Sequence, residues 1–202
     1  MRIPLLLPPG VAAPPAAGPT ARPVPGGAPR VVAVGPLRDG RVDRDLDAVL
    51  AGRPDGVLLR GAVGARDFQH LGAKLAVREA ELGLPAGRIG ILAAAADTPA
   101  GVLALSGLAG ASPRLRALVW EAGPLARALG LGDPAAGPLL RARDLLVLAA
   151  AAAGVPALAM PEPGRTLADS CADAARDGFA GMVARGPGEV AVIARWFPAR
   201  AP

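Results

Sequence analysis

Three residue types that often carry chemistry occur only once each in this chain: His70, Cys171 and Lys74. A Ser-His-Asp triad or a histidine-based zinc site would depend on His70 alone, and one cysteine allows neither an intrachain disulfide nor a cysteine cluster. His70 lies within a helical pattern and is interpreted as a surface residue, and Cys171 as a buried or half-buried helix residue. The sequence contains no phosphate-binding loop and no dinucleotide-binding fingerprint. Carboxylates and arginines are therefore the groups left to consider.

The charge balance is basic, with 22 Lys and Arg against 17 Asp and Glu. The arginines are scattered, and aromatic residues make up only 2% of the chain. A nucleic-acid surface needs clustered arginines with stacking aromatics, so we interpret the excess as codon bias and expect no nucleic-acid partner. The longest apolar run, 145–160, is shorter than the ~20 residues of a membrane helix. The leucines near the N-terminus are interrupted by prolines, unlike a secretory signal. We expect a cytoplasmic protein without membrane contact.

The elements that must position these groups follow a regular alternation. Residues 1–30 are rich in Pro, Gly and Ala and predict an extended or flexible tail. Residues 31–202 form the predicted domain, in which short β-rich runs alternate with helical patterns. We expect strands at 31–34, 56–60, 89–95, 115–119, 155–159 and 180–184. We expect helices near 43–52, 65–83, 99–110, 136–153, 166–177 and 188–196. Six strand-helix repeats indicate an α/β fold with parallel strands.

Local signals support several helix ends. Thr98 precedes Pro99, which places a capping hydroxyl before a proline at the first helical position. Thr166 and Asp169 have capping-box spacing. Gly130 and Gly154 are suited to helix termination.

The order of these segments resembles the citrate lyase beta subunit and HpcH/HpaI aldolase family. The resemblance covers about residues 31–198 and rests on collinear stretches: DGVLLR (55–60), ELGLPAGRIGIL (81–92), DTPAGVLAL (97–105), SPRLRALVWEAGPLARALGLG (112–132), GPLLRARDLLVLAAAAAGVPAL (137–158) and DGFAGMVARGP (177–187). It implies an incomplete TIM-type (β/α) barrel of about six parallel βα units, because the family's first two units have no counterpart here. A complete barrel typically needs ~250 residues. Either the tail contributes an irregular strand, or a partner chain covers the exposed strand edges, or the sheet is open.

The resemblance also implies a metal site. In the family, two carboxylates beyond the fifth and sixth strands hold Mg²⁺, which polarises the carbonyl of an acyl-CoA. Asp97 falls at the first of these positions, one methylene shorter than the family's glutamate. Pro124 stands at the second, and Glu121, three residues earlier, is the candidate replacement. Asp97 and Glu121 are therefore the predicted ligands of Mg²⁺.

Several other functional positions of the family carry different residues. Its third-strand arginine falls at Ala33, the lysine after the fourth strand at Gly61, and the last unit's lysine and histidine at Met182 and Gly186. Arg60 and Arg185 are the candidate substrate-binding cations. Barrel enzymes keep their sites at the carboxyl ends of the strands. The charged residues expected there are Arg38, Asp39, Arg60, Asp97, Glu121, Glu162 and Arg185.

Each candidate also has a structural interpretation. Asp97 immediately precedes a helix and would stabilise its positive end, which we favour over metal binding. Glu121 would be a solvated loop charge. Arg60 and Arg185 would be surface or ion-pairing residues.

We expect a divergent relative of Mg²⁺-dependent acyl-CoA carbon–carbon lyases that is catalytically impaired and acts as a binding or assembly subunit. An acyl-CoA is the implied ligand, and a second copy or a partner subunit the implied protein partner. The alternative is an active Mg²⁺-dependent lyase of an ester such as citryl-CoA or malyl-CoA. A third alternative is a truncated chain without stable function.

Overall fold

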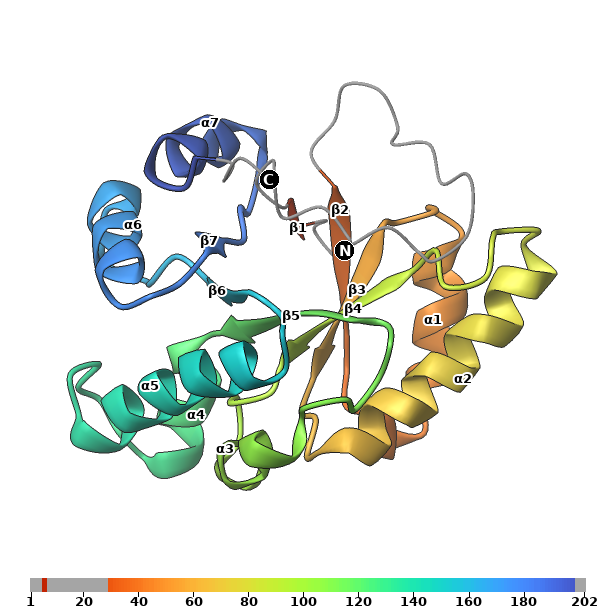
Figure 1. The fold of residues 1–202 in the computed structure, drawn as a ribbon, viewed down its shortest axis with the longest axis horizontal. Helices are drawn as coiled ribbons and strands as arrows, with labels where there is room; N and C mark the ends of the chain where they lie inside the picture. Colours follow the sequence, from red (N-terminus) through yellow and green to blue (C-terminus); the bar gives the residue numbers. More distant parts are fainter. Residues whose placement is uncertain (1–4, 7–28, 199–202) are drawn as a thin grey trace.

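Six parallel strands lie side by side in chain order, and a two-residue strand, β1, pairs antiparallel with the first of them. The computed structural model describes residues 5–6 and 29–198. The sheet is curled, with helices outside it (Figure 1), so the predicted incomplete TIM-type barrel is confirmed. The strands are β1 (Leu5–Leu6), β2 (Arg30–Val34), β3 (Gly56–Arg60), β4 (Gly90–Ala94), β5 (Leu115–Trp120), β6 (Ala157–Ala159) and β7 (Gly181–Met182).

The two edges of this sheet differ. Leu5 and Leu6 pair with Val31 and Arg30, so β1 covers part of the β2 edge. At the other edge, β7 pairs only with β6 among the described residues. The predicted tail falls largely outside the described residues, and the domain boundary at residue 30 stays a prediction.

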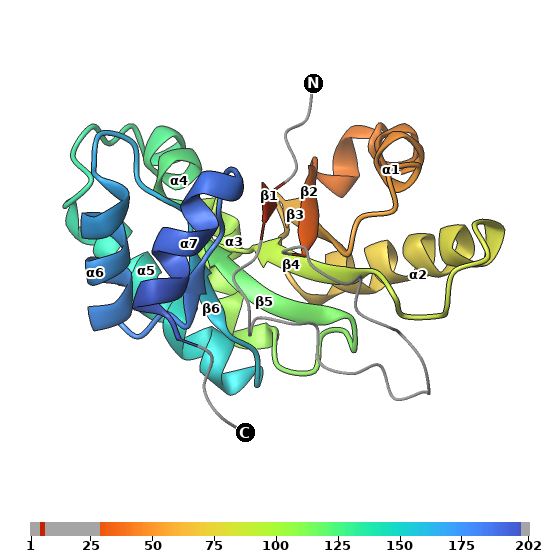
Figure 2. The ribbon, with the colours of Figure 1, turned by 90° about the horizontal axis from the view of Figure 1, so that it is seen from above.

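Helices follow every parallel strand, as predicted, and pack outside the sheet (Figure 2). They are α1 (Val42–Leu50), α2 (Ala65–Glu81), α3 (Pro99–Ala104), α4 (Ala122–Leu129), α5 (Gly137–Ala152), α6 (Leu167–Arg176) and α7 (Pro187–Trp196). Two 3-10 turns, Leu37–Asp39 and Leu105–Gly107, follow β2 and α3. Helix α4 was not predicted from the sequence, and α3 ends at Ala104, before the end of the helix predicted near 99–110.

The core has two layers, one on each face of the sheet. The inner layer consists of strand residues and those just after them: Val31, Leu58, Leu92, Ala94, Ala117, Val119, Leu158, Met160 and Val183. The outer layer joins the other strand face to the helices, with Phe68, Leu71 and Leu75 of α2 fully buried. Parallel strands covered on both faces read as continuous apolar runs, which is why β3, β4 and β5 consist mostly of Val, Leu, Ile and Ala.

The predicted caps are present. Thr98 Oγ1 accepts from the Gly101 N–H at 3.0 Å, with Pro99 at the first helical position of α3. Thr166 Oγ1 accepts from the Asp169 N–H at 3.1 Å. These hydroxyls satisfy backbone donors that lack partners inside the helix. Gly130 ends α4 in the left-handed conformation, at φ 67°. His70 is exposed and Cys171 buried, as expected.

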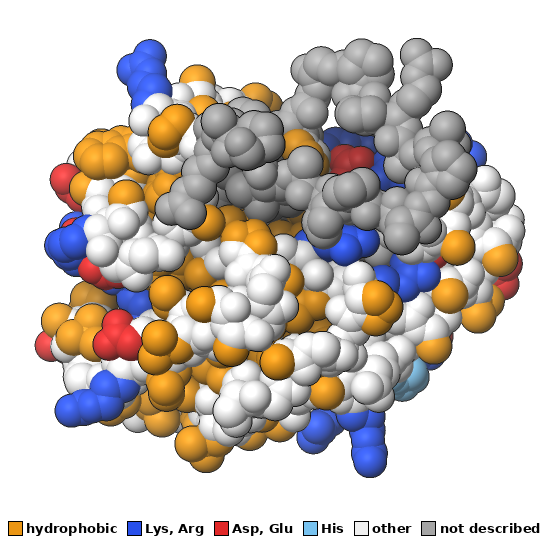
Figure 3. Space-filling model, in the orientation of Figure 1, with side chains coloured by type: hydrophobic (Ala, Val, Ile, Leu, Met, Phe, Trp, Pro, Cys, Tyr) orange, Lys and Arg blue, Asp and Glu red, His pale blue; other side chains and the backbone are white. Residues whose placement is uncertain are grey.

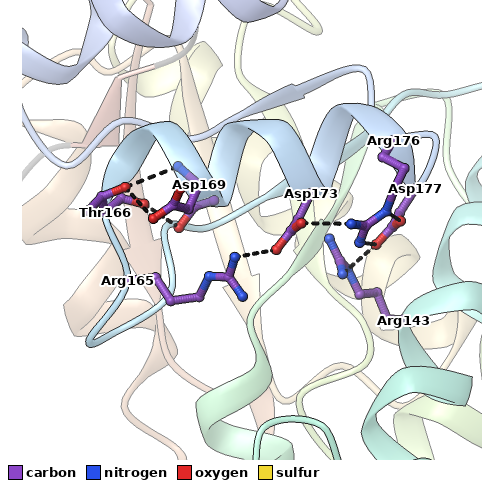
Figure 4. Close-up of polar contacts among 8 residues, drawn as sticks. Arg143, Arg165, Thr166, Asp169, Asp173, Arg176 and Asp177 are labelled. Carbon is purple, nitrogen blue, oxygen red and sulfur yellow. Dashed lines mark hydrogen bonds and ion pairs between the residues drawn. The ribbon is translucent and has the colours of Figure 1, made fainter.

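Charged side chains tie α6 to its neighbours (Figure 4). Arg143 of α5 reaches Asp177 at 2.6 Å, and its guanidinium lies 5.1 Å from the Phe179 ring centroid. Asp173 of α6 contacts both Arg165 and Arg176. Because Arg143 combines an ion pair with a cation–π contact, it joins the end of α6 to α5 more firmly than an exposed ion pair alone.

Candidate functional site

Three of the predicted site residues lie at the carboxyl ends of adjacent strands. Arg60 is the last residue of β3, Asp97 follows β4 after two buried alanines, and Glu121 directly follows β5 and is the N-cap of α4. Parallel strands end at the same edge of the sheet, which brings the three side chains to the mouth of the incomplete barrel. The structure therefore groups Arg60, Asp97 and Glu121 as candidates for one site.

Asp97 is a buried carboxylate, only 7% exposed. Its Oδ2 accepts from the Gly61 N–H at 2.8 Å, which links the loop after β4 to the loop after β3. Its Oδ1 is buried and has no hydrogen-bond partner. Burial raises the pKa of Asp97, although the Gly61 N–H and the positive charge of Arg60 oppose that rise. An unsatisfied buried oxygen is rare in folded proteins and calls for a ligand or a structural reason.

This geometry adds a contact between two loops to the helix-end role predicted for Asp97, which stays a prediction. Thr98 caps α3, as predicted, and the hydrogen bond to Asp97 comes from Gly61 in another loop. The negative charge of Glu121 also helps to raise the pKa of Asp97. Asp97 thus belongs to the mouth of the barrel, in contact with the β3 loop.

Arg60 and Glu121 form an ion pair, with Arg60 Nη1 2.5 Å from Glu121 Oε2. Their side chains are 30% and 28% exposed. Glu121 is therefore a paired, half-buried side chain instead of the solvated loop charge considered above. Arg60 is the ion-pairing residue that its structural interpretation anticipated.

Arg185 lies apart, beyond β7. Its side chain donates to the Pro161 carbonyl beyond β6, and its backbone N–H donates to Glu189 Oε2 at 2.7 Å. Arg38 is exposed after β2, and Glu162 is half-buried after β6. No interaction joins these residues to the Arg60–Glu121 pair among the described contacts. Whether Arg60 and Arg185 bind a substrate stays a prediction.

Two glycines shape this mouth, and one of them, Gly61, is the residue aligned above with the family's lysine. Gly61 has φ +66°, and a Cβ there would lie 3.0 Å from Pro36 Cγ. A Cβ on Gly101 would lie 2.3 Å from the Ala95 carbonyl oxygen and 2.9 Å from that of Ala62. The loops after β3 and β4 therefore approach α3 too closely for any larger residue at 101. The segment DTPAG was visible in the sequence, but this close approach was not.

The donor set fits Mg²⁺ in chemical type but is small. Mg²⁺ prefers oxygen ligands and commonly takes one or two protein carboxylates with waters and substrate oxygens. Asp97 and Glu121 supply two carboxylates, and Asp97 Oδ1 is free of hydrogen bonds. Among residues 5–6 and 29–198, no three His, Cys, Asp or Glu side chains are grouped to hold a metal. An ion would depend on this pair and on oxygens from water or a ligand.

Within residues 5–6 and 29–198, no helix is both long and apolar enough to cross a bilayer. The sequence matches no protein-family model and no curated protein.

Solved structures do resemble the chain. RipC from Yersinia pestis is 24% identical, with a TM-score of 0.69 over 86% of this chain and 78% of RipC. A citrate lyase beta subunit from M. tuberculosis, complexed with oxaloacetate and magnesium, is 24% identical, with a TM-score of 0.62 over 83% of this chain and 72% of that one. CitE from Mycobacterium tuberculosis, in complex with magnesium, acetoacetate and coenzyme A, is 24% identical, with a TM-score of 0.60 over 83% and 60%.

At 24% sequence identity these likenesses show the fold and not an activity, and the TM-scores of 0.60 to 0.69 establish the architecture. The chain spans 60% to 78% of the length of these three structures. The resemblance inferred from the sequence is thus confirmed at the level of the fold: this chain has the barrel fold of the citrate lyase beta subunit, in an incomplete form of six parallel βα units.

Proposed function

We propose that this protein is a divergent member of the citrate lyase beta subunit and HpcH/HpaI aldolase family that binds an acyl-CoA and has lost efficient lyase activity. The observation that carries the proposal is the Arg60–Glu121 ion pair, in which one of two candidate metal carboxylates is already matched by an internal cation. Substitutions at Ala33, Gly61, Met182 and Gly186 support the same conclusion, because catalysis by a barrel uses groups from several strand ends together.

Acyl-CoA is the proposed ligand because a structural neighbour binds coenzyme A and acetoacetate. Arg60 and Arg185 are the cations at the carboxyl edge that we propose for its anionic groups, since guanidinium groups bind carboxylate and phosphate through paired hydrogen bonds. A cytoplasmic location stays a prediction from the sequence.

The direct test is calorimetric titration of the purified chain with acetyl-CoA, alongside an assay for cleavage of citryl-CoA and malyl-CoA with Mg²⁺. We expect binding without cleavage. Arg185→Gln should weaken binding roughly tenfold, within the range for a hydrogen bond to a charged group. Arg44→Gln, an exposed change on α1, is the matched control and should bind like the wild type. Absence of acetyl-CoA binding would contradict the proposal.

The alternative is an active Mg²⁺-dependent lyase. It is favoured by one observation, the buried and unpartnered Oδ1 of Asp97, which is an available metal donor. Neighbours with bound magnesium support Mg²⁺ as the cofactor, and Asp97 and Glu121 are the ligands that we propose for it. Mg²⁺-dependent cleavage that is abolished by Asp97→Asn would establish this alternative in place of the binding role.

We also propose that the chain works as an assembly, either with itself or with a partner subunit. Exposed leucines lie on three neighbouring helices: Leu103 on α3, Leu129 on α4, and Leu140, Leu145 and Leu148 on α5. Figure 3 shows hydrophobic side chains gathered over the α4–α5 region. Exposed apolar groups of this kind commonly mark contact surfaces. A concentration-independent monomer in sedimentation experiments would argue against self-association.

A further inference from the structure

The Arg60–Glu121 ion pair spans the carboxyl end of a third strand. Arg60 pairs in register with Ala94 of β4, and Glu121 follows β5 on the far side of β4. Residues two apart in an extended chain lie on the same face. Arg60 therefore shares a face with Leu58, and Glu121 shares one with Val119, and both Leu58 and Val119 belong to the inner layer. The ion pair therefore crosses the end of β4, above the inner layer and next to the loop that carries Asp97.

The three charges do not balance without a further cation or a proton. Two carboxylates face one guanidinium, and Asp97 interacts electrostatically with both Arg60 and Glu121. Asp97 is 7% exposed, and its Oδ1 has no hydrogen-bond partner. This buried, unpartnered oxygen is a second observation, independent of the acidic pair, that points to a ligand at this place.

We propose that the Arg60 guanidinium occupies the cation position of the Asp97–Glu121 pair, so that a divalent metal binds only by displacing Arg60 from Glu121. The proposal rests on the proposed function only in taking these two carboxylates as the metal donors. A tethered guanidinium competes for Glu121 Oε2 at every metal concentration, and its charge repels an incoming ion. The wild-type chain should therefore bind Mg²⁺ weakly.

Displacement would also release Arg60 at the mouth of the barrel. A free guanidinium there can take a carboxylate or phosphate group through two hydrogen bonds. An anionic ligand that draws Arg60 away from Glu121 should raise the metal affinity, and by linkage the metal should raise the affinity for that ligand by the same factor. Arg60 would then couple metal binding to ligand binding.

The test measures metal binding alone. Mg²⁺ binding is measured by calorimetry, and Mn²⁺ binding by the loss of the electron paramagnetic resonance signal of the free ion. Arg60→Gln should bind either ion roughly fivefold more tightly than the wild type, since a half-exposed ion pair no longer has to be broken. Arg60→Lys, which keeps the charge, should show a smaller gain. Arg44→Gln should match the wild type, and melting curves of all variants check that each is folded.

The double variant Arg60→Gln/Asp97→Asn places the metal at this pair, because the gain should disappear when Asp97 loses its charge. Equal metal affinity in the wild type and Arg60→Gln, or a gain that survives Asp97→Asn, would overturn the inference. The proposed function fails separately, through loss of acetyl-CoA binding. Tighter metal binding by Arg60→Gln, together with a wild-type chain that binds no acetyl-CoA, would therefore reject the function and keep the inference.

Discussion

Glu79 and Arg114 form a two-point ion pair at the amino-terminal edge of the sheet, with Arg114 Nη1 2.8 Å from Glu79 Oε1 and Nη2 2.7 Å from Oε2. Glu79 is 1% exposed and also accepts from the N–H groups of Gly87 and Ile89. This one carboxylate thereby joins α2 to the starts of β4 and β5. At the carboxyl ends of the strands, where the candidate site lies, the carboxylates have fewer hydrogen-bond partners, and Asp97 Oδ1 has none.

Removal of Glu79 should destabilise the fold strongly. Glu79→Ala leaves the Arg114 guanidinium and two backbone donors without their partner, and breaking a buried pair in this way costs about 3 kcal/mol. Urea unfolding measures the loss. Glu81→Ala, an exposed change at the end of the same helix, should alter the free energy of unfolding by less than ~0.5 kcal/mol. Equal losses in the two variants would contradict this role for Glu79.

Glu79 should also contribute to acid sensitivity. Burial raises its pKa, but hydrogen bonds from Arg114, Ile89 and Gly87 outweigh burial and hold the pKa below its ordinary value. A depressed folded-state pKa stabilises the protein above the unfolded-state pKa, and this contribution is lost as the pH falls through the folded-state pKa. The difference in unfolding free energy between wild type and Glu79→Gln should shrink on acidification below the ordinary carboxyl pKa. A difference that stays constant with pH would contradict this assignment.

Gly101 should not tolerate a side chain. A Cβ added at this position would lie 2.3 Å from the backbone oxygen of Ala95, so α3 would have to shift away from the mouth of the barrel. We expect Gly101→Ala to lower the free energy of unfolding by roughly 1–3 kcal/mol, as overpacking typically does. Gly107→Ala is the control, because a Cβ there meets nothing within 4 Å. Thermal and urea unfolding of the two variants would distinguish them, and similar stabilities would refute the close approach.

A charge on the exposed face of α5 should weaken self-association. Leu148 is 65% exposed, and Leu148→Glu adds a charge that disfavours an apolar contact without disturbing the core. Sedimentation at several concentrations should show a shift toward the monomer. Val77→Glu on α2, at a site 56% exposed, is the control and should leave assembly unchanged. If both variants associate like the wild type, α5 is not the contact surface.

The succession of strands and helices could be predicted because its signals are local. Apolar runs such as GVLLR and IGILAAA carry the strand pattern within a few residues, and Thr98-Pro99 marks a helix start by itself. Strands β6 and β7 are shorter than the predicted 155–159 and 180–184, although the N–H groups of Ala180 and Val183, on either side of β7, still donate to β6 carbonyls. The missed helix α4 contains Gly123 and Pro124 in its first turn, where both residues are tolerated but weaken the sequence pattern.

The sequence by itself determined that Arg60, Asp97 and Glu121 would lie at the carboxyl ends of three successive strands, because parallel strands bring those ends together on one side of the sheet. Only the tertiary structure decided that Arg60 reaches across β4 to Glu121, and that Asp97 accepts a hydrogen bond from Gly61 in the loop after β3. The partners Glu79 and Arg114 are 35 residues apart and were equally invisible in the sequence. The physical reason is shared: strand and helix signals arise from neighbouring residues, whereas the partner of a charge is set by the curvature and packing that bring distant loops together.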